Sequence, residues 1–179
     1  MNTLVTILIV FFGLIALLLL IALFVKKEYA IEREIIINKT KQMVFNYIKL
    51  LKNQDTFSKW ANIDPAMEKE YRGTDGTVGF VSAWNSNVKN VGKGEQTIKK
   101  ITDGEDIDFD IHFIKPMDAR AKARMSTEAL SENETKVKWG FSSGMKYPMN
   151  FMLLFINMEN MLGDDLSTGL NNLKIDLEK

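Results

Sequence analysis

The chain has 179 residues, in which 23 Lys and Arg balance 23 Asp and Glu, with no Cys and one His. Nucleic acid is excluded as an expected partner, because proteins that bind it normally carry a clustered basic surplus. A chain without Cys forms no disulfide, and a single His cannot complete a multi-histidine zinc site, so we expect no metal and no cofactor.

Residues 4–25 form an apolar run without a charge. At about 1.5 Å per residue, a helix of this length crosses a hydrocarbon layer about 30 Å thick. A core helix would keep a polar stripe, and this run is apolar on every face. The alternative is a cleaved signal peptide, but no Lys or Arg precedes the run and no small-residue cleavage pattern follows it before Lys26. We predict a transmembrane anchor in residues 1–27 and one α+β domain in residues 28–179.

The positive charges that flank this run all follow it, so the positive-inside bias places the domain on the cytoplasmic side of the cell membrane, in a single-pass protein. They are Lys26, Lys27, Arg33, Lys39 and Lys41. Large domains are also translocated regardless of such charges, and the opposite side stays the alternative. No feature of the sequence indicates an oligomeric state.

Residues 28–37 alternate apolar and charged side chains, which predicts a half-buried strand. Thr40 is a suitable N-cap for an amphipathic helix over residues 43–51. A second short helix is predicted over residues 55–60. We expect it to end by Asp64-Pro65, because the residue before a proline disfavours helical geometry.

Period-two alternation recurs four times further along the chain, at residues 78–84, 107–113, 120–127 and 137–141. Short turn clusters separate these runs, and the spacing predicts an antiparallel meander. A stripe of leucines from Leu162 to Leu177 predicts a long amphipathic C-terminal helix.

Several short sequence words occur in an order that resembles the START-like, or SRPBCC, superfamily, and within it the bacterial polyketide-cyclase/dehydrase and lipid-transport branch. They include Val44-Phe45, Asp64-Pro65-Ala66-Met67, Gly92-x-Gly94-Glu95, Lys115-Pro116-Met117, Thr135-x-Val137-x-Trp139 and Gly169-Leu170. The resemblance implies a helix-grip fold, in which a curved antiparallel sheet wraps a long C-terminal helix and leaves an apolar tunnel. Members of that superfamily include lipid carriers, quinone-binding proteins and aromatase/cyclases, so the fold does not decide the function.

Ten side chains are the expected walls of a ligand cavity, some of them bulky aromatics and others small or flexible groups that leave volume for a guest. They are Trp60, Phe80, Trp84, Phe109, Phe113, Ala121, Ala123, Met125, Trp139 and Phe141. An ordinary core is the alternative for the same set. The methionines near the C-terminal helix, such as Met149 and Met158, are interpreted either as an adaptable gate or as core filling.

Arg33 shares the inner face of its strand by strict alternation, where it could anchor an anionic head group. The alternative is a bulge, or a strand start that still lies outside the core, either of which leaves Arg33 in solvent. His112, Asp108 and Asp110 alternate to the outer face and are interpreted as surface groups, neither a metal site nor a catalytic one. Gly92-x-Gly94 lacks the Lys and Ser or Thr of a phosphate loop and is interpreted as a turn or bulge.

The leading hypothesis is a non-catalytic, membrane-anchored protein that binds a hydrophobic small molecule or lipid in an internal cavity. One alternative is a polyketide cyclase or dehydratase that uses polar groups such as Arg33, Glu95 or Tyr147. Another is a non-catalytic protein-interaction module at the membrane, which would show an exposed apolar patch instead of a cavity.

Overall fold

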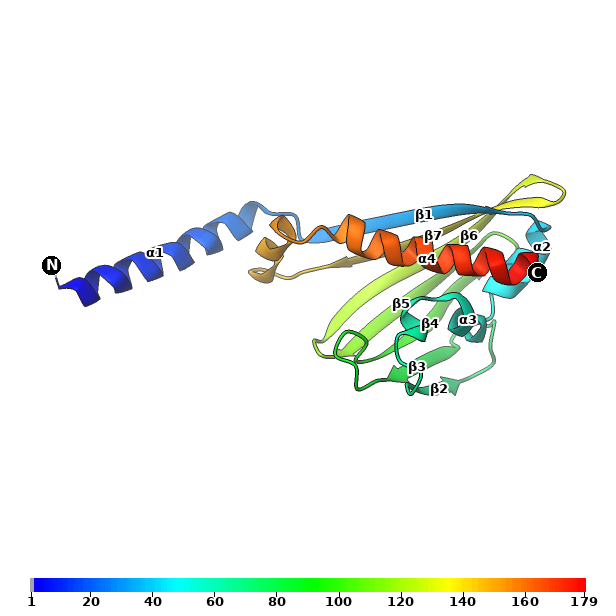
Figure 1. The fold of residues 1–179 in the computed structure, drawn as a ribbon, viewed down its shortest axis with the longest axis horizontal. Helices are drawn as coiled ribbons and strands as arrows, with labels where there is room; N and C mark the ends of the chain where they lie inside the picture. Colours follow the sequence, from blue (N-terminus) through cyan, green and yellow to red (C-terminus); the bar gives the residue numbers. More distant parts are fainter. Residues whose placement is uncertain (1) are drawn as a thin grey trace.

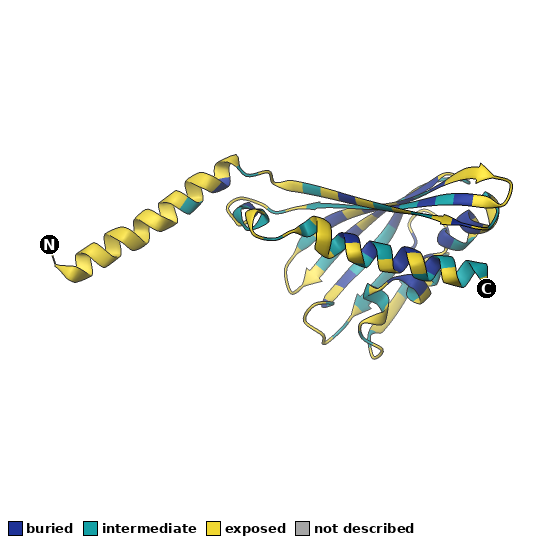
Figure 2. Ribbon diagram, turned by 45° about the horizontal axis from the view of Figure 1, so that its top comes forward, coloured by how far each residue is buried: buried dark blue, intermediate teal, exposed yellow. Residues whose placement is uncertain are grey.

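The computed structural model describes residues 2–179 and contains a long apolar helix that leads into a sheet covered by helices (Figure 1). Helix α1 spans Thr3–Phe24 and carries no charge. It extends away from the rest of the chain, and Ala22 is its one buried residue (Figure 2). The helix is long and apolar enough to cross a membrane, a property that signal sequences share.

Seven antiparallel strands form one curved sheet in the order β1-β7-β6-β5-β4-β3-β2. The strands are β1 Glu28–Ile37, β2 Glu68–Arg72, β3 Val81–Asn85, β4 Lys93–Thr102, β5 Asp106–Lys115, β6 Ala119–Ser131 and β7 Glu134–Gly144. Strands β2 to β7 follow each other as a meander, and β1 pairs with β7. The predicted antiparallel meander is confirmed.

Three details of the meander differ from the prediction. Strand β4 was not among the predicted runs, because its apolar residues Ile98 and Ile101 are three positions apart and show no period-two alternation. Strand β2 was not among the predicted runs, because its charged sequence, EKEYR, shows no apolar alternation. Strand β3 begins at Val81 and not at residue 78, since Gly79 has a positive φ of 91° and breaks the extended backbone.

Short helices connect β1 to β2. Helix α2, Lys41–Ile48, begins after Thr40, whose side chain accepts a hydrogen bond from the Met43 amide, so the predicted cap is confirmed. The predicted helix over residues 55–60 is shorter in the structure, where α3 spans Gln54–Phe57 and a separate 3₁₀ turn, η2, spans Trp60–Asn62. Ser58 separates the two because its backbone is extended, with ψ at 126°.

Helix α4, Met158–Glu178, lies along the inner face of the sheet and contacts β1 and β7 (Figure 1). Leu166, Leu170 and Leu173 are buried toward the sheet, which confirms the predicted leucine stripe. Before α4, the 3₁₀ segment η3 spans Met149–Leu154 and contacts α1.

Two glycines bring α4 close to the sheet. A Cβ atom at Gly169 would lie 2.6 Å from the Trp139 ring, and one at Gly163 would lie 2.0 Å from the Arg33 guanidinium. Arg33 and Trp139 are direct cross-strand partners on β1 and β7. The Trp139 ring also meets Phe57 and Trp60 edge to face, with centroids 5.7 and 6.0 Å away. Trp139 therefore fills the space between the middle of α4 and the sheet.

Candidate functional site

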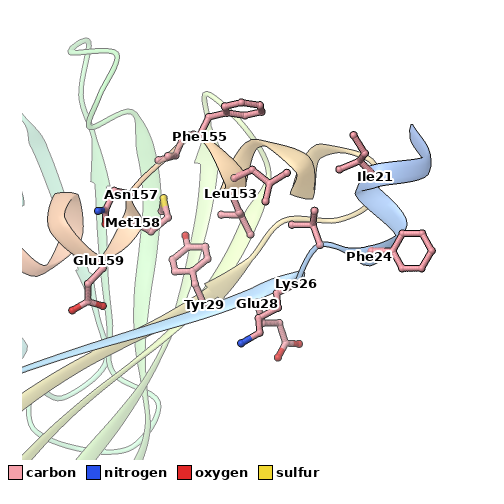
Figure 3. Close-up of a pocket in the computed structure, with 13 residues that line it drawn as sticks. Ile21, Phe24, Lys26, Glu28, Tyr29, Leu153, Phe155, Asn157, Met158 and Glu159 are labelled. Carbon is pink, nitrogen blue, oxygen red and sulfur yellow. The ribbon is translucent and has the colours of Figure 1, made fainter. Parts of the chain in front are cut away.

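An open groove of about 830 Å³ lies where α1 meets the rest of the chain (Figure 3). Its walls come from the last turn of α1, the first residues of β1, and the segment that runs from η3 into α4. The lining residues are Ile21, Phe24, Val25, Lys26, Glu28, Tyr29, Leu153, Leu154, Phe155, Ile156, Asn157, Met158 and Glu159. Most of these side chains are apolar, and the charged ones occur where β1 and α4 begin. The groove thus suits an apolar molecule with a polar end.

Tyr29 and Met158 line the groove from opposite elements. Figure 3 shows the Tyr29 ring rising from β1 toward the start of α4, where Met158 is located. Burial raises the pKa of the Tyr29 hydroxyl, and a hydrogen bond with Ser143 offsets part of this effect. The hydroxyl therefore stays protonated at neutral pH and provides a neutral hydrogen-bonding group in the groove.

Arg33 lies on the inner face of β1, as strict alternation predicted. The pairing of β1 with β7 runs from Glu28 to Ile37 without a register shift, so the alternative of a bulge is wrong. Its Nη1 atom lies 2.6 Å from the Glu159 carboxylate, and Nη2 donates to the Glu159 carbonyl oxygen at 3.2 Å. Since Glu159 lines the groove, this ion pair lies at its border, and 29% of the Arg33 side chain remains exposed.

The ten predicted cavity residues all belong to one continuous apolar core. Phe80, Phe109, Ala121, Ala123, Met125 and Trp139 are buried, and Trp60, Trp84, Phe113 and Phe141 pack against them. None of the ten lines the groove beside α1. Their role as walls of a ligand cavity stays a prediction.

A second hollow of about 550 Å³ lies over strands β1, β7, β6, β5 and β4. Glu32, Lys100, Asp108, Lys122 and Arg124 are among its lining residues, together with Phe109, Ala123 and Phe141, three of the ten predicted cavity residues. Charges of both signs surround it, which suits an apolar guest less well than the first groove does.

The polar groups considered for catalysis lie on separate elements, and most of them pair with other side chains. Glu95 pairs with Arg72 at 2.6 Å, and Tyr147 is 43% exposed in the connection between β7 and η3. His112 contacts Asp118 at 2.9 Å and not the two carboxylates of its own strand. Those carboxylates pair elsewhere, Asp108 with Arg124 and Asp110 with Lys99. Within residues 2–179, no group of three His, Cys, Asp or Glu side chains is placed to hold a metal ion.

Gly92 and Gly94 form the predicted bulge. Gly92 has a positive φ of 62°, and the register of β4 against β5 shifts between Lys93 and Gly94. A Cβ atom at Gly94 would lie 2.5 Å from the Trp84 ring, so this glycine makes room for an aromatic side chain. The interpretation as a turn or bulge is confirmed.

Sequence reasoning missed the segment from η3 to α4 as a wall of the groove. A signal was present, because residues 147–158 contain no charge although they lie between the charged Lys146 and Glu159. Their periodicity fits neither a strand nor a long helix, so the sequence indicated a role only for Tyr147 and the methionines among them.

No protein-family model matches the sequence, and a search of curated proteins found no match. Solved structures do match. Norcoclaurine synthase from Thalictrum flavum, in complex with dopamine and hydroxybenzaldehyde, has a TM-score of 0.61 at 9% identity, with 84% of this chain and 87% of that chain covered. A Chromobacterium violaceum protein has a TM-score of 0.59 at 12% identity, over 84% and 97% of the two chains. A Nitrosospira multiformis protein has a TM-score of 0.56 at 13% identity, over 83% and 95%.

Structural similarity at such low sequence identity shows the fold alone. The chain has an α+β helix-grip fold, which is the fold that the resemblance to the START-like, or SRPBCC, superfamily implied. Its assignment to the polyketide-cyclase and lipid-transport branch stays a prediction.

Proposed function

We propose that this protein is a single-pass membrane protein that binds a hydrophobic small molecule or lipid taken from the bilayer. Residues 1–27 serve as the anchor and residues 28–179 as the binding domain, on the cytoplasmic side. The observation that carries the proposal is the open apolar groove at the junction of α1 with the domain. A guest that leaves the membrane beside α1 meets this groove first.

The chemistry of the groove supports an apolar guest. Its volume of about 830 Å³ falls in the range of about 300–1,000 Å³ that is usual for small-molecule sites. Ile21, Leu153, Ile156 and Met158 offer apolar surface, whose burial contributes about 25 cal/mol per Å². Tethering also raises the effective concentration of a membrane-derived guest at the groove.

Arg33 is the proposed polar anchor for the guest. Its partner Glu159 is 56% exposed, so this carboxylate can rotate into solvent at small cost and leave the guanidinium to an anionic head group. The Tyr29 hydroxyl is the nearest neutral donor on the same strand. A guest of this kind would have one anionic or hydrogen-bonding end and an apolar tail.

We propose binding without catalysis, because Arg33 and Tyr29, the two groups proposed to meet the polar end of a guest, do not form an acid and base set. Catalysis of that kind needs a proton donor and acceptor in reach of one substrate. The Arg33 guanidinium carries hydrogen-bond donors and no acceptor, and burial raises the pKa of Tyr29, so neither of them is suited to act as a general base at neutral pH.

The test is mass spectrometry of the solvent extract of the full chain, purified in lipid nanodiscs and then exchanged into detergent. Three proteins are compared: wild type, Met158→Trp, which adds bulk in the groove, and Ala123→Leu, which adds bulk on the inner face of the sheet. Retention of a stoichiometric lipid or apolar molecule that Met158→Trp loses and Ala123→Leu keeps supports the groove. If only Ala123→Leu loses the molecule, the guest lies on the inner face of the sheet. If the wild-type protein retains no molecule, the proposal is refuted.

A further inference from the structure

We infer that residues 147–158 form a second membrane contact, which lies in the interface of the bilayer beside the end of α1. This segment is called the η3 segment below. The inference rests on the proposed role of α1 as a membrane anchor, and it adds a surface, a partner and an orientation to that role. The partner is the boundary between lipid head groups and acyl chains.

The η3 segment exposes large apolar side chains and carries no charge. Phe155 is 76% exposed, Leu154 57% and Met149 48%. Single exposed apolar residues are normal on soluble proteins, but a run of them along one segment marks a surface that is covered by something. In Figure 3 the ring of Phe155 and that of Phe24, at the end of α1, both lie away from Tyr29.

Hydrogen bonds fix the η3 segment to the end of α1. The amide nitrogen of Asn150 donates to the carbonyl oxygens of Ala22 at 2.7 Å and Val25 at 2.9 Å. Carbonyls at the C-terminus of a helix have no partner within the helix, so Asn150 satisfies two groups that would otherwise be orphaned. Asn150 is fully buried, and next to this contact the Met145 amide donates to the Lys27 carbonyl at 2.8 Å.

This attachment decides the depth of the segment. If α1 crosses the bilayer, Lys26 and Lys27 lie among the head groups directly after it. The η3 segment is bonded to the last turn of α1 and therefore lies at the same level. Its aromatic residues Tyr147, Phe151 and Phe155 are of the type enriched at this depth.

Lipid is favoured over a protein partner because the apolar surface of the η3 segment is continuous with that of the anchor. Phe24 and Ile21 of α1 line the same groove as Leu154 and Phe155. If the end of α1 and the η3 segment both insert into the bilayer, the groove between them opens toward the acyl chains. A guest would then pass from the bilayer into the groove without crossing water.

The experiment uses single-cysteine variants, which are simple to make because the chain contains no Cys. Phe155→Cys places a fluorescent label on the η3 segment, and Phe12→Cys places one in the middle of α1. Leu130→Cys is the matched control, since Leu130 is apolar and 43% exposed near the β6–β7 turn. That turn lies at the end of β1 farthest from α1, because Ile37 pairs with Thr135 while Glu28 pairs with Gly144.

Each full-length variant is labelled with nitrobenzoxadiazole and reconstituted into phosphatidylcholine and phosphatidylglycerol vesicles with doxyl lipids as quenchers. We expect shallow doxyl groups to quench the label at Phe155 about threefold more than the label at Leu130, since an interfacial segment lies about 5–10 Å into the boundary region. Equal, weak quenching at Phe155 and Leu130 overturns the inference if the label at Phe12 is quenched. A blue-shifted but unquenched label at Phe155 also overturns it and points to a protein partner or a second copy. Absence of quenching at Phe12 refutes the anchor itself, and with it the proposed function.

Discussion

Substitution of Gly169 by Ala tests whether Trp139 fills the space under α4. The new Cβ atom would lie 2.6 Å from Cζ3 of Trp139, 3.4 Å from its Cη2 and 3.5 Å from the Phe57 carbonyl oxygen. The ring has little room to move aside because Phe57 and Trp60 hold it edge to face. Overpacking of this kind costs about 1–3 kcal/mol. The higher helix propensity of Ala stabilises the helix by about 1 kcal/mol, so we expect the free energy of unfolding to fall by up to about 2 kcal/mol.

Gly163→Ala is the matched control on the same helix. There the Cβ atom would meet the end of the Arg33 side chain, at 2.0 Å from Nη2, and this flexible group can rotate into solvent. Loss of its ion pair costs about 0–1 kcal/mol, which the gain in helix propensity of about 1 kcal/mol offsets. The free energy of unfolding should therefore stay close to that of wild type.

The assay is urea unfolding of the full chain in detergent, followed by the fluorescence of the three Trp residues, all of which lie outside α1. We expect Gly169→Ala to unfold at lower urea than Gly163→Ala, with an unchanged slope. If Gly169→Ala is as stable as Gly163→Ala, Trp139 has an empty space into which it can turn. That result would refute the packed interior and favour an inner cavity.

Three further predictions concern the hydrogen bonds and charges around the groove and the core. Burial and a hydrogen bond to Asp55 raise the pKa of Tyr71 above 10.0, so its contribution to stability is complete below about pH 10 and is lost as the pH rises further. Urea unfolding at pH 9 to 11 should show a shallower alkaline loss of stability in Tyr71→Phe, and equal slopes would contradict the assignment. Asn150→Leu leaves the Ala22 and Val25 carbonyls without their donor, a loss of about 1–3 kcal/mol, so amides of residues 145–157 should exchange faster by hydrogen–deuterium mass spectrometry while those of the β6–β7 turn do not. Glu159→Gln frees Arg33 and should raise the ratio of anionic to zwitterionic lipid that co-purifies by up to about fivefold, whereas Arg33→Gln should lower it, and an unchanged ratio in both would remove Arg33 as the polar anchor.

The fold could be predicted from the sequence wherever buried side chains recur at the regular spacing of a strand or a helix. Residues 28–37 alternate strictly because one face of β1 packs under α4, and the leucine stripe of α4 follows from burial on the same interface. Strand β2 has no such alternation, because four of its five residues are exposed and only Tyr71 packs against the core.

The candidate site was harder to predict because it depends on contacts between distant segments. Asn150 acquires its role from Ala22 and Val25, more than 100 positions earlier in the chain, and nothing near it in the sequence indicates this contact. The groove likewise arises where the end of α1, the start of β1 and the η3 segment meet. The ten residues predicted as cavity walls lie in or against one apolar core, and the alternation of side chains alone does not distinguish a packed core from a cavity wall.

The central claim, that the groove holds an apolar guest from the membrane, is tested most directly by photo-crosslinking. The full chain is reconstituted with a phospholipid that carries a diazirine near the end of one acyl chain, irradiated, and mapped by peptide mass spectrometry. We expect crosslinks on groove residues such as Tyr29 and Met158 in addition to those on α1, and loss of the groove crosslinks in Met158→Trp. Crosslinks confined to α1, with none in residues 28–29 or 153–159, would contradict the claim.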